Sequence, residues 1–244
     1  MDFLVGKAGL VLSVLLALFV LERIFPVVRF HDNVPRLARN FFLALVNGAL
    51  SPLIVIPITM VATRWMVPWR PESLLIDLLL LDCWTYIWHR MNHVVPVLWR
   101  FHEVHHLDEM LDASSGLRFH FGEVVLSALA RSVVIVALAV PLAHVVIFET
   151  VLALIVLFHH SNIQLPGWLE RPLSLVIVTP SIHWVHHHAR RSDTDSNYAS
   201  VLSVWDRIFR SRSPTVRDPS MKIGVEGIGD ATLWRILLRP FYKV

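Results

Sequence analysis

The chain has 244 residues, of which 55% are hydrophobic and 17% are charged, and its mean hydropathy is +0.57. This composition is typical of a membrane protein and argues against a soluble globular domain. The net charge of +3 is modest and no long basic tract is present, so nucleic-acid binding is not expected. The single cysteine, Cys83, excludes an intramolecular disulfide and is expected to be a packed apolar residue.

Apolar runs in chain order predict an all-α, integral membrane bundle of about four to five spans. The first run covers about 6–21 and is interpreted as a retained span, because no small-residue cleavage site follows it. The second covers about 41–62, and the third begins near residue 73. The fourth, 124–158, is too long for one span across a hydrocarbon core of ~30 Å. It therefore predicts a helical hairpin that turns near Pro141.

Beyond about residue 164 the chain is mostly polar, and the short apolar run 173–178 is expected to lie at the membrane interface. Arginines after the first apolar run predict that the following loop is cytoplasmic. With alternating spans, all histidine-rich segments then face the cytoplasm and form a helical cap. The predicted organisation is an N-terminal transmembrane hairpin (1–70), a catalytic domain (71–210) and a cytoplasmic C-terminal tail (211–244).

Thirteen of the 14 histidines lie between residues 89 and 188. Eight of them form three clusters with helical spacing, HxxxH at 89–93, HxxHH at 102–106 and HxxHH at 183–187, so each cluster shares one helix face. Eight converging imidazoles exceed the needs of one tetrahedral ion and predict two metal ions. Imidazole suits iron, zinc, copper and nickel, so ligand type alone does not select the metal. The isolated His31 and His144, and His188, are interpreted as ordinary interfacial or core residues.

These clusters, in this order among apolar runs, resemble those of the fatty acid hydroxylase and sterol desaturase superfamily. Three further segments are similar to motifs of that family: "RFHFGE" at 118–123, "FHHSNI" at 158–163 and "DSNYASVLSVWDRIF" at 195–209. The resemblance covers roughly residues 70–210. The chain departs from the family pattern at Phe121, where proline is usual, at Ala199, where glycine is usual, and at Arg210-Ser211, where glycine-threonine usually follows.

The resemblance implies a site of two iron ions that activates O2 and oxidises an unactivated C–H bond of a lipid. The implied ligands are His89, His93, His102, His105, His106, His160, His183, His186 and His187. His120 and His159 are candidates either as further ligands or as groups that orient a ligand. Acidic side chains that could orient the rings are Asp82, Glu103, Glu123, Asp195 and Asp206, and Asn197 is a further candidate.

No flavin, haem or NAD motif is visible, so an external donor such as a cytochrome b5 or a ferredoxin is expected to supply electrons. A basic patch of Arg190, Arg191, Arg207 and Arg210 is the hypothesised docking surface, and unchanged reduction kinetics after charge reversal there would exclude it. The residues do not separate hydroxylation from desaturation. Sterol, fatty acyl, sphingoid, carotenoid and alkyl ether lipids all remain open as substrates.

Two other classes of function each agree with part of the sequence. A membrane zinc hydrolase is favoured by "HEVHH" at 102–106, which fits the H-E-x-x-H pattern with Glu103 as the base. Its weakness is that one zinc ion leaves most of the clustered histidines unexplained. A metal transporter or sensor would distribute its ligands along a pore, whereas these histidines gather at one membrane face.

Overall fold

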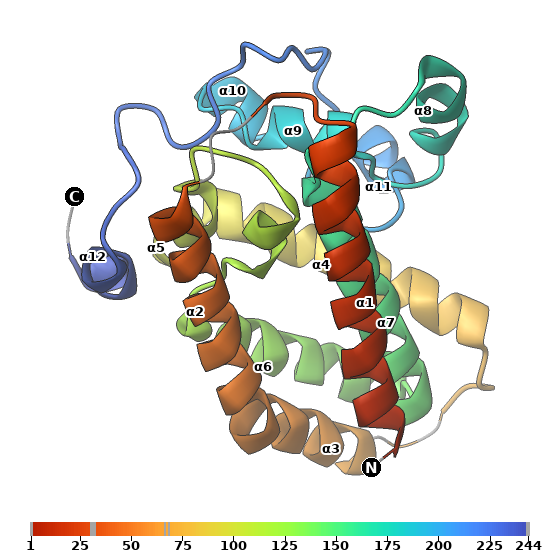
Figure 1. Ribbon diagram of the computed structural model, residues 1–244. Coiled ribbons are helices and arrows are strands. Elements are labelled where there is room, and N and C mark those ends of the chain that lie inside the picture. Colours follow the sequence, from red (N-terminus) through yellow and green to blue (C-terminus); the bar gives the residue numbers. More distant parts are fainter. Residues whose placement is uncertain (1, 30–32, 66, 68, 243–244) are drawn as a thin grey trace.

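The computed structural model describes residues 2–29, 33–65, 67 and 69–242 (Figure 1). In this described part, the regular elements are all helices, and β-pairing is limited to isolated bridges such as Ile177 with Leu202. The predicted all-α class is therefore confirmed. Long helices form the body of the molecule, and short helices from the second half of the chain gather at one end of it.

The first half of the body consists of α1 (Asp2–Ile24), α2 (Val34–Leu50) and α3 (Ile56–Trp65). A short π-helix, η1 (Ser51–Val55), joins α2 to α3 into one continuous helical stretch. Pro52 lies within η1 and cannot donate a backbone hydrogen bond, so the regular α-helical ladder is interrupted at this point. This stretch contains the predicted second span.

The second half of the body consists of α4 (Leu74–Val94), α6 (Phe121–Leu138) and α7 (Leu142–His160). The predicted turn within the fourth apolar run is present, because α6 ends at Ala139 in the left-handed region with φ 51°. The two helices then diverge rather than pack along each other. Helix α6 packs mainly on α3, whereas α7 packs on α1 and α4.

Three helical stretches among the described residues are long and apolar enough to cross a membrane: Val34–Trp65, Phe121–Leu138 and Leu142–His160. Large apolar side chains on them are exposed, including Leu45, Leu53 and Val133. Helices α1 and α4 form where the first and third spans were predicted but are not among these three, and α4 carries three charged residues within its length. The count of four to five spans and the cytoplasmic side of the histidines remain predictions.

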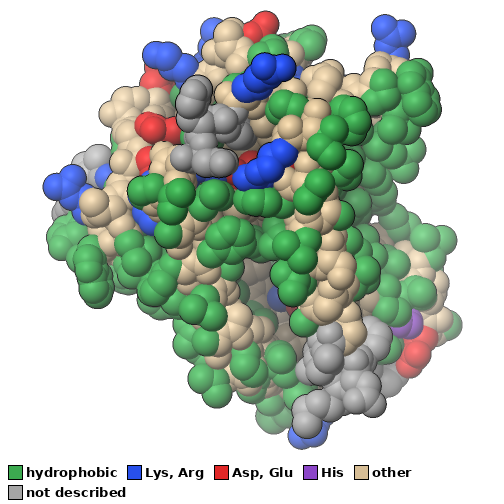
Figure 2. Space-filling model, in the orientation of Figure 1, with side chains coloured by type: hydrophobic (Ala, Val, Ile, Leu, Met, Phe, Trp, Pro, Cys, Tyr) green, Lys and Arg blue, Asp and Glu red, His purple; other side chains and the backbone are tan. Residues whose placement is uncertain are grey.

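Short helices cover the end of the body that carries the histidines. They are α5 (Pro96–His106), η2 (Ala113–Leu117), α8 (Gly167–Leu173), α9 (Pro180–His186), α10 (Arg191–Thr194) and α11 (Val204–Ile208). Helices α5 and α9 each begin at a proline, where the missing backbone N–H costs nothing. Figure 2 shows charged side chains mostly over this end and hydrophobic side chains over the long helices.

The C-terminal segment returns to the body through α12 (Leu233–Leu238) and η3 (Arg239–Phe241). Ile236 is buried against Leu43 and Val104, and Arg239 Nε donates to Glu103 Oε2 at 2.6 Å. The segment predicted as a tail is therefore packed against α2 and the outer face of α5.

Candidate metal centre

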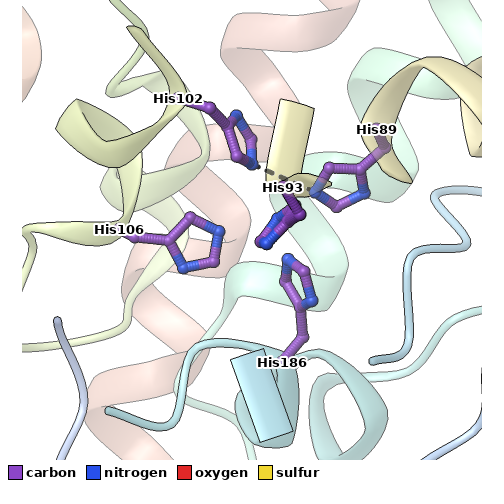
Figure 3. Close-up of side chains that lie close together, drawn as sticks. All are labelled: His89, His93, His102, His106 and His186. Atoms are coloured by element: carbon purple, nitrogen blue, oxygen red, sulfur yellow. Dashed lines mark hydrogen bonds between the residues drawn. The ribbon is translucent and has the colours of Figure 1, made fainter. Parts of the chain in front are cut away.

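Nine histidines gather in two groups in which each ring offers a nitrogen within 4.8 Å of the others. The first group contains His89, His93, His102, His106 and His186, and their rings converge from α4, α5 and α9 (Figure 3). The second group contains His105, His160, His183 and His187, from α5, α7 and the end of α9. These nine are the residues that the family resemblance implies as ligands, and the structure brings all of them together.

The helical spacing explains why α5 and α9 each serve both groups. His102 and His106 are four residues apart on α5, and both rings belong to the first group. His105 precedes His106 by one residue, so its side chain leaves the helix in a different direction and its ring belongs to the second group. In the same way, α9 sends His186 to the first group and His183 to the second. The two groups therefore lie next to each other, because the same two helices contribute histidines to both.

The outward nitrogens of five rings face oxygen atoms that can only accept hydrogen bonds. Nδ1 lies 2.7 Å from Tyr198 O in His89, 2.7 Å from Glu123 Oε1 in His102, and 3.2 Å from Arg118 O in His105. His160 and His186 make the same contact with the Val156 and Ser196 carbonyls, both at 2.7 Å. A carbonyl or a carboxylate requires the proton on Nδ1, so Nε2 of each ring carries a free lone pair.

Four of these Nε2 atoms face one another in two pairs inside the site. His89 Nε2 lies 3.1 Å from His102 Nε2, and His105 Nε2 lies 3.0 Å from His160 Nε2. Neither atom of such a pair has a proton to share, so the contact is not a hydrogen bond. A spacing of ~3 Å is expected for two nitrogens bound at right angles to one ion at ~2.1 Å. The donor set therefore fits a metal ion in each group.

The burial of the histidines also supports metal binding by both groups. Apart from His89, which faces a cavity, the nine residues are at most 2% exposed. Both ring nitrogens of His93 and His106 are buried without a hydrogen-bond partner among the described residues. Burial, followed by neighbouring histidines, lowers the pKa of His105, His106, His183 and His187 well below the usual value. Burial also lowers the pKa of His186 to about 3, so these rings are neutral and able to bind metal.

The two further candidate histidines lie outside both groups. His120 caps the N-terminus of α6, where its Nδ1 accepts from Gly122 N at 3.0 Å and its Nε2 donates to Leu237 O at 3.1 Å. Both nitrogens are occupied, so His120 fastens the C-terminal segment and offers no atom to a metal. His159 lies against His183, with ring centroids 3.9 Å apart, and lines the adjoining cavity.

The other isolated histidines take part in ordinary contacts. His144 Nδ1 lies 2.6 Å from Asp77 Oδ2, and His188 Nδ1 lies 2.8 Å from Asp193 Oδ2. His31 lies outside the described residues. Neither described residue belongs to the two histidine groups, which agrees with their interpretation as ordinary interfacial or core residues.

The acidic candidates separate into two kinds. Glu123 contacts His102 directly, and Asp195 Oδ1 lies 3.5 Å from His93 Nδ1. Asp82 accepts from Leu202 N and Trp205 Nε1, and Asp206 accepts from the backbone N–H groups of Tyr198 and Ala199. These two acids therefore hold the loop whose Tyr198 carbonyl orients His89.

Two remaining candidates do not touch the histidine rings. Glu103 follows His102 on α5 and lies on the outer face, where it pairs with Arg239. It therefore does not stand as a base beside the His102 and His106 nitrogens. Asn197, with φ 51°, accepts from Ser213 N and donates to Ile182 O, which connects the loop to α9.

Sequence patterns did not identify the backbone carbonyls that orient the rings. Three of them, at Arg118, Ser196 and Tyr198, belong to the segments that resemble family motifs. Sequence patterns also did not identify a cavity of about 370 Å³ that reaches the rings of both groups, including His89, His102 and His160. Its wall is largely apolar and includes Val124 of α6 and aliphatic side chains of α7 such as Leu152 and Val156.

Replacing Glu123 by alanine is expected to weaken metal binding at the first group by ~10- to 100-fold, because the His102 ring loses the carboxylate that fixes its tautomer. The measurement is metal competition against a calibrated chelator. Glu103→Ala is the matched control. It also removes a carboxylate, but the Glu103 side chain lies on the outer face of α5, pairs with Arg239 and contacts no histidine ring. Equal losses in both variants would contradict the assigned role of Glu123.

The family model described as Fatty acid hydroxylase matches residues 74–211, which is more than half of the chain and includes all nine histidines. The ornithine lipid hydroxylase OlsE of Rhizobium tropici is 26% identical over 82% of this chain and 62% of its own length. The human alkylglycerol monooxygenase is 33% identical over 59% of this chain and 31% of its own length.

A very-long-chain aldehyde decarbonylase of Oryza sativa subsp. indica is 30% identical over 56% of this chain and 23% of its own length. The chain thus spans less than two thirds of the length of each of these relatives. No solved structure matches it significantly. The match to the family model, together with the ordered histidine clusters, shows that the chain belongs to the fatty acid hydroxylase family.

Proposed function

We propose that this protein is an O2-dependent di-iron oxygenase that hydroxylates or desaturates an unactivated C–H position of a lipid. The observation that carries the proposal is the pair of histidine groups, whose inward nitrogens face one another without protons. Membership of the family supports the reaction class, and the relatives named as ornithine lipid hydroxylase and alkylglycerol monooxygenase support a lipid substrate.

Two bound iron ions would supply the activation of O2 and the removal of hydrogen from the C–H bond. In hydroxylation, one C–H bond becomes C–OH, and O2 also yields one water by taking up two electrons and two protons. The electrons come from an external donor such as a cytochrome b5, a ferredoxin or a similar carrier.

The chain's own residues hold the rings and the substrate in place. Glu123 keeps the proton on His102 Nδ1, and the Tyr198 and Arg118 carbonyls do the same for His89 and His105. The apolar wall of the cavity excludes water and accommodates a hydrocarbon chain beside the rings. Preorganised ligands and a dry substrate channel are what the protein contributes to such chemistry.

The zinc hydrolase receives less support from the site than the oxygenase does. Its proposed base, Glu103, pairs with Arg239 on the outer face of α5. One zinc ion would also leave a second complete group of histidines without a role.

Electron entry is proposed on the face that carries Arg191. Its Nη2 donates to His93 O at 3.0 Å, and its guanidinium lies 4.4 Å from the centroid of the Trp99 ring. Trp99 in turn lies 5.1 Å from the His93 ring, centroid to centroid. A donor docked beside Arg190 and Arg191 would therefore meet only a thin layer of protein before the first group. This face is proposed to be cytoplasmic.

The decisive experiment measures the metal content of the detergent-purified chain by mass spectrometry, after expression with iron and zinc both supplied. Two irons per chain are expected, one for each group. The iron-loaded protein should then oxidise a member of a lipid panel only when O2 and a reductant are both present. One zinc per chain, with turnover in the absence of O2, would instead indicate the hydrolase.

A further inference from the structure

A cluster of three charged residues lies at the end of the cavity opposite the histidines. Lys7 of α1, Arg131 of α6 and Glu149 of α7 all line the cavity. Lys7 Nζ lies 3.3 Å from Glu149 Oε2, and Arg131 Nη2 lies 2.9 Å from Glu149 Oε1. Arg131 and Glu149 lie within helices apolar enough to span a membrane, where ionisable side chains are costly and usually serve a function.

The charges of this cluster do not balance. One carboxylate is shared by two cations, so the cluster carries a net positive charge and spare hydrogen-bond donors. The ammonium of Lys7 offers three donors and the guanidinium of Arg131 offers five. Arg131 Nε is buried without a hydrogen-bond partner among the described residues. An ion pair that served only to join helices would need one cation, so this cluster has one positive charge in excess, which an anionic ligand could neutralise.

The charged cluster marks the open end of the cavity. The side chains of Lys7, Arg131 and Glu149 are 24%, 14% and 23% exposed, whereas His102, His105 and His160 at the other end are at most 2% exposed. Figure 2 shows the surface hollowed between the hydrophobic side chains of α1 and α2. A lipid would therefore enter with its apolar chain first and keep its polar group at the charged cluster.

Helix α7 carries residues of both ends of the cavity and indicates the scale of their separation. Glu149 precedes His160 by eleven residues on this helix, which corresponds to ~16 Å at the rise of an α-helix. The wall between them is formed largely by aliphatic side chains, including Leu152, Val156 and Leu157. The volume of about 370 Å³ lies near the lower end of the range for small-molecule sites, which suits one hydrocarbon chain.

We propose that Lys7 and Arg131 bind the anionic oxygen group of a single-chain lipid, a carboxylate or a phosphate, and so select the carbon that reaches the histidines. The oxidised position is then set by the separation of these cations from the histidine rings. This inference rests on the proposed function for the reaction, but the binding it describes does not depend on turnover.

The test measures equilibrium binding of radiolabelled palmitate, hexadecyl phosphate and hexadecanol to the full chain in detergent, without O2 or reductant. Arg131→Gln is expected to weaken binding of the anionic ligands by about tenfold, because a charge-assisted contact is lost, and to change hexadecanol binding little. Glu149→Gln is expected to tighten anion binding, because it removes the competing carboxylate. Arg131→Lys should retain most of the anion binding, and Arg64→Gln, an exposed basic residue outside the cavity, is the control.

The opposite signs of the two glutamine variants distinguish a ligand site from an internal ion pair. If Arg131→Gln and Glu149→Gln weaken all three ligands alike, together with the thermal stability, the cluster is structural and the proposal is wrong. It is also wrong if neither variant changes the binding of either anion. An effect on palmitate alone, or on the phosphate alone, supports the site and identifies the anionic group. If the variants bind both anions as the unmodified chain does and the chain still oxidises a lipid, the anion site is wrong but the proposed function stands.

Discussion

In the proposed di-iron site, replacing His105 or His106 by alanine is expected to remove one iron each, and from different groups. The two residues are neighbours on α5, yet His105 belongs to the four-histidine group and His106 to the five-histidine group. Each variant should retain about one iron per chain and lose lipid oxidation by more than ~100-fold, because loss of a ligand costs more than loss of a group that orients one. The measurements are metal content by mass spectrometry and O2-dependent turnover.

His188→Ala is the matched control for these two variants. His188 follows His187 directly but lies outside both groups and pairs with Asp193. It should retain both irons. A His105→Ala variant with full metal content, or a His188→Ala variant that loses as much as the other two, would contradict the assignment of the groups.

Replacing Arg36 by methionine is expected to lower the free energy of unfolding by ~3–5 kcal/mol, the cost of leaving buried charges without their partner. Arg36 is 3% exposed and joins α2 to the loop after α5. Its Nη1 donates to Asp108 Oδ2 at 2.9 Å and to Met110 O at 3.1 Å, and its Nη2 pairs with Asp112. Removing the cation leaves two buried carboxylates that repel each other.

The measurement is chemical or thermal unfolding of the full chain in detergent. Arg235→Met is the control, because Arg235 is exposed on α12 and its loss should change stability by less than ~0.5 kcal/mol. A loss below ~1 kcal/mol for Arg36→Met would show that the two carboxylates find other partners or become protonated.

Helical periodicity allowed much of the site to be predicted from the sequence. The i, i+3, i+4 spacing at 102–106 and 183–187 identified rings on shared helix faces, and the family resemblance added His160. The division into groups of five and four could not be predicted, because it depends on how α4, α5, α7 and α9 are placed relative to one another. The orienting carbonyls could not be predicted either, since every residue has the same main-chain acceptor.

Apolar runs likewise predicted the long helices but not their arrangement. The break near Pro141 was predicted, yet the divergence of α6 and α7 depends on packing with α1, α3 and α4. The docking of the C-terminal segment rests on pairs such as Glu103 with Arg239, which are 136 residues apart. Arg131 and Glu149 were overlooked for the same reason, because only the fold brings them together beside Lys7.

The order in which the proposed ligands occur along the chain implies an order of metal loading during biosynthesis. By the time α4 and α5 have been synthesised, four of the five histidines of the first group are available on two consecutive helices. The second group has only His105 at that stage and must wait for α7 and α9. In the proposed di-iron site, the first group is therefore expected to be able to bind a metal ion before α9 has been synthesised, and the second group only afterwards.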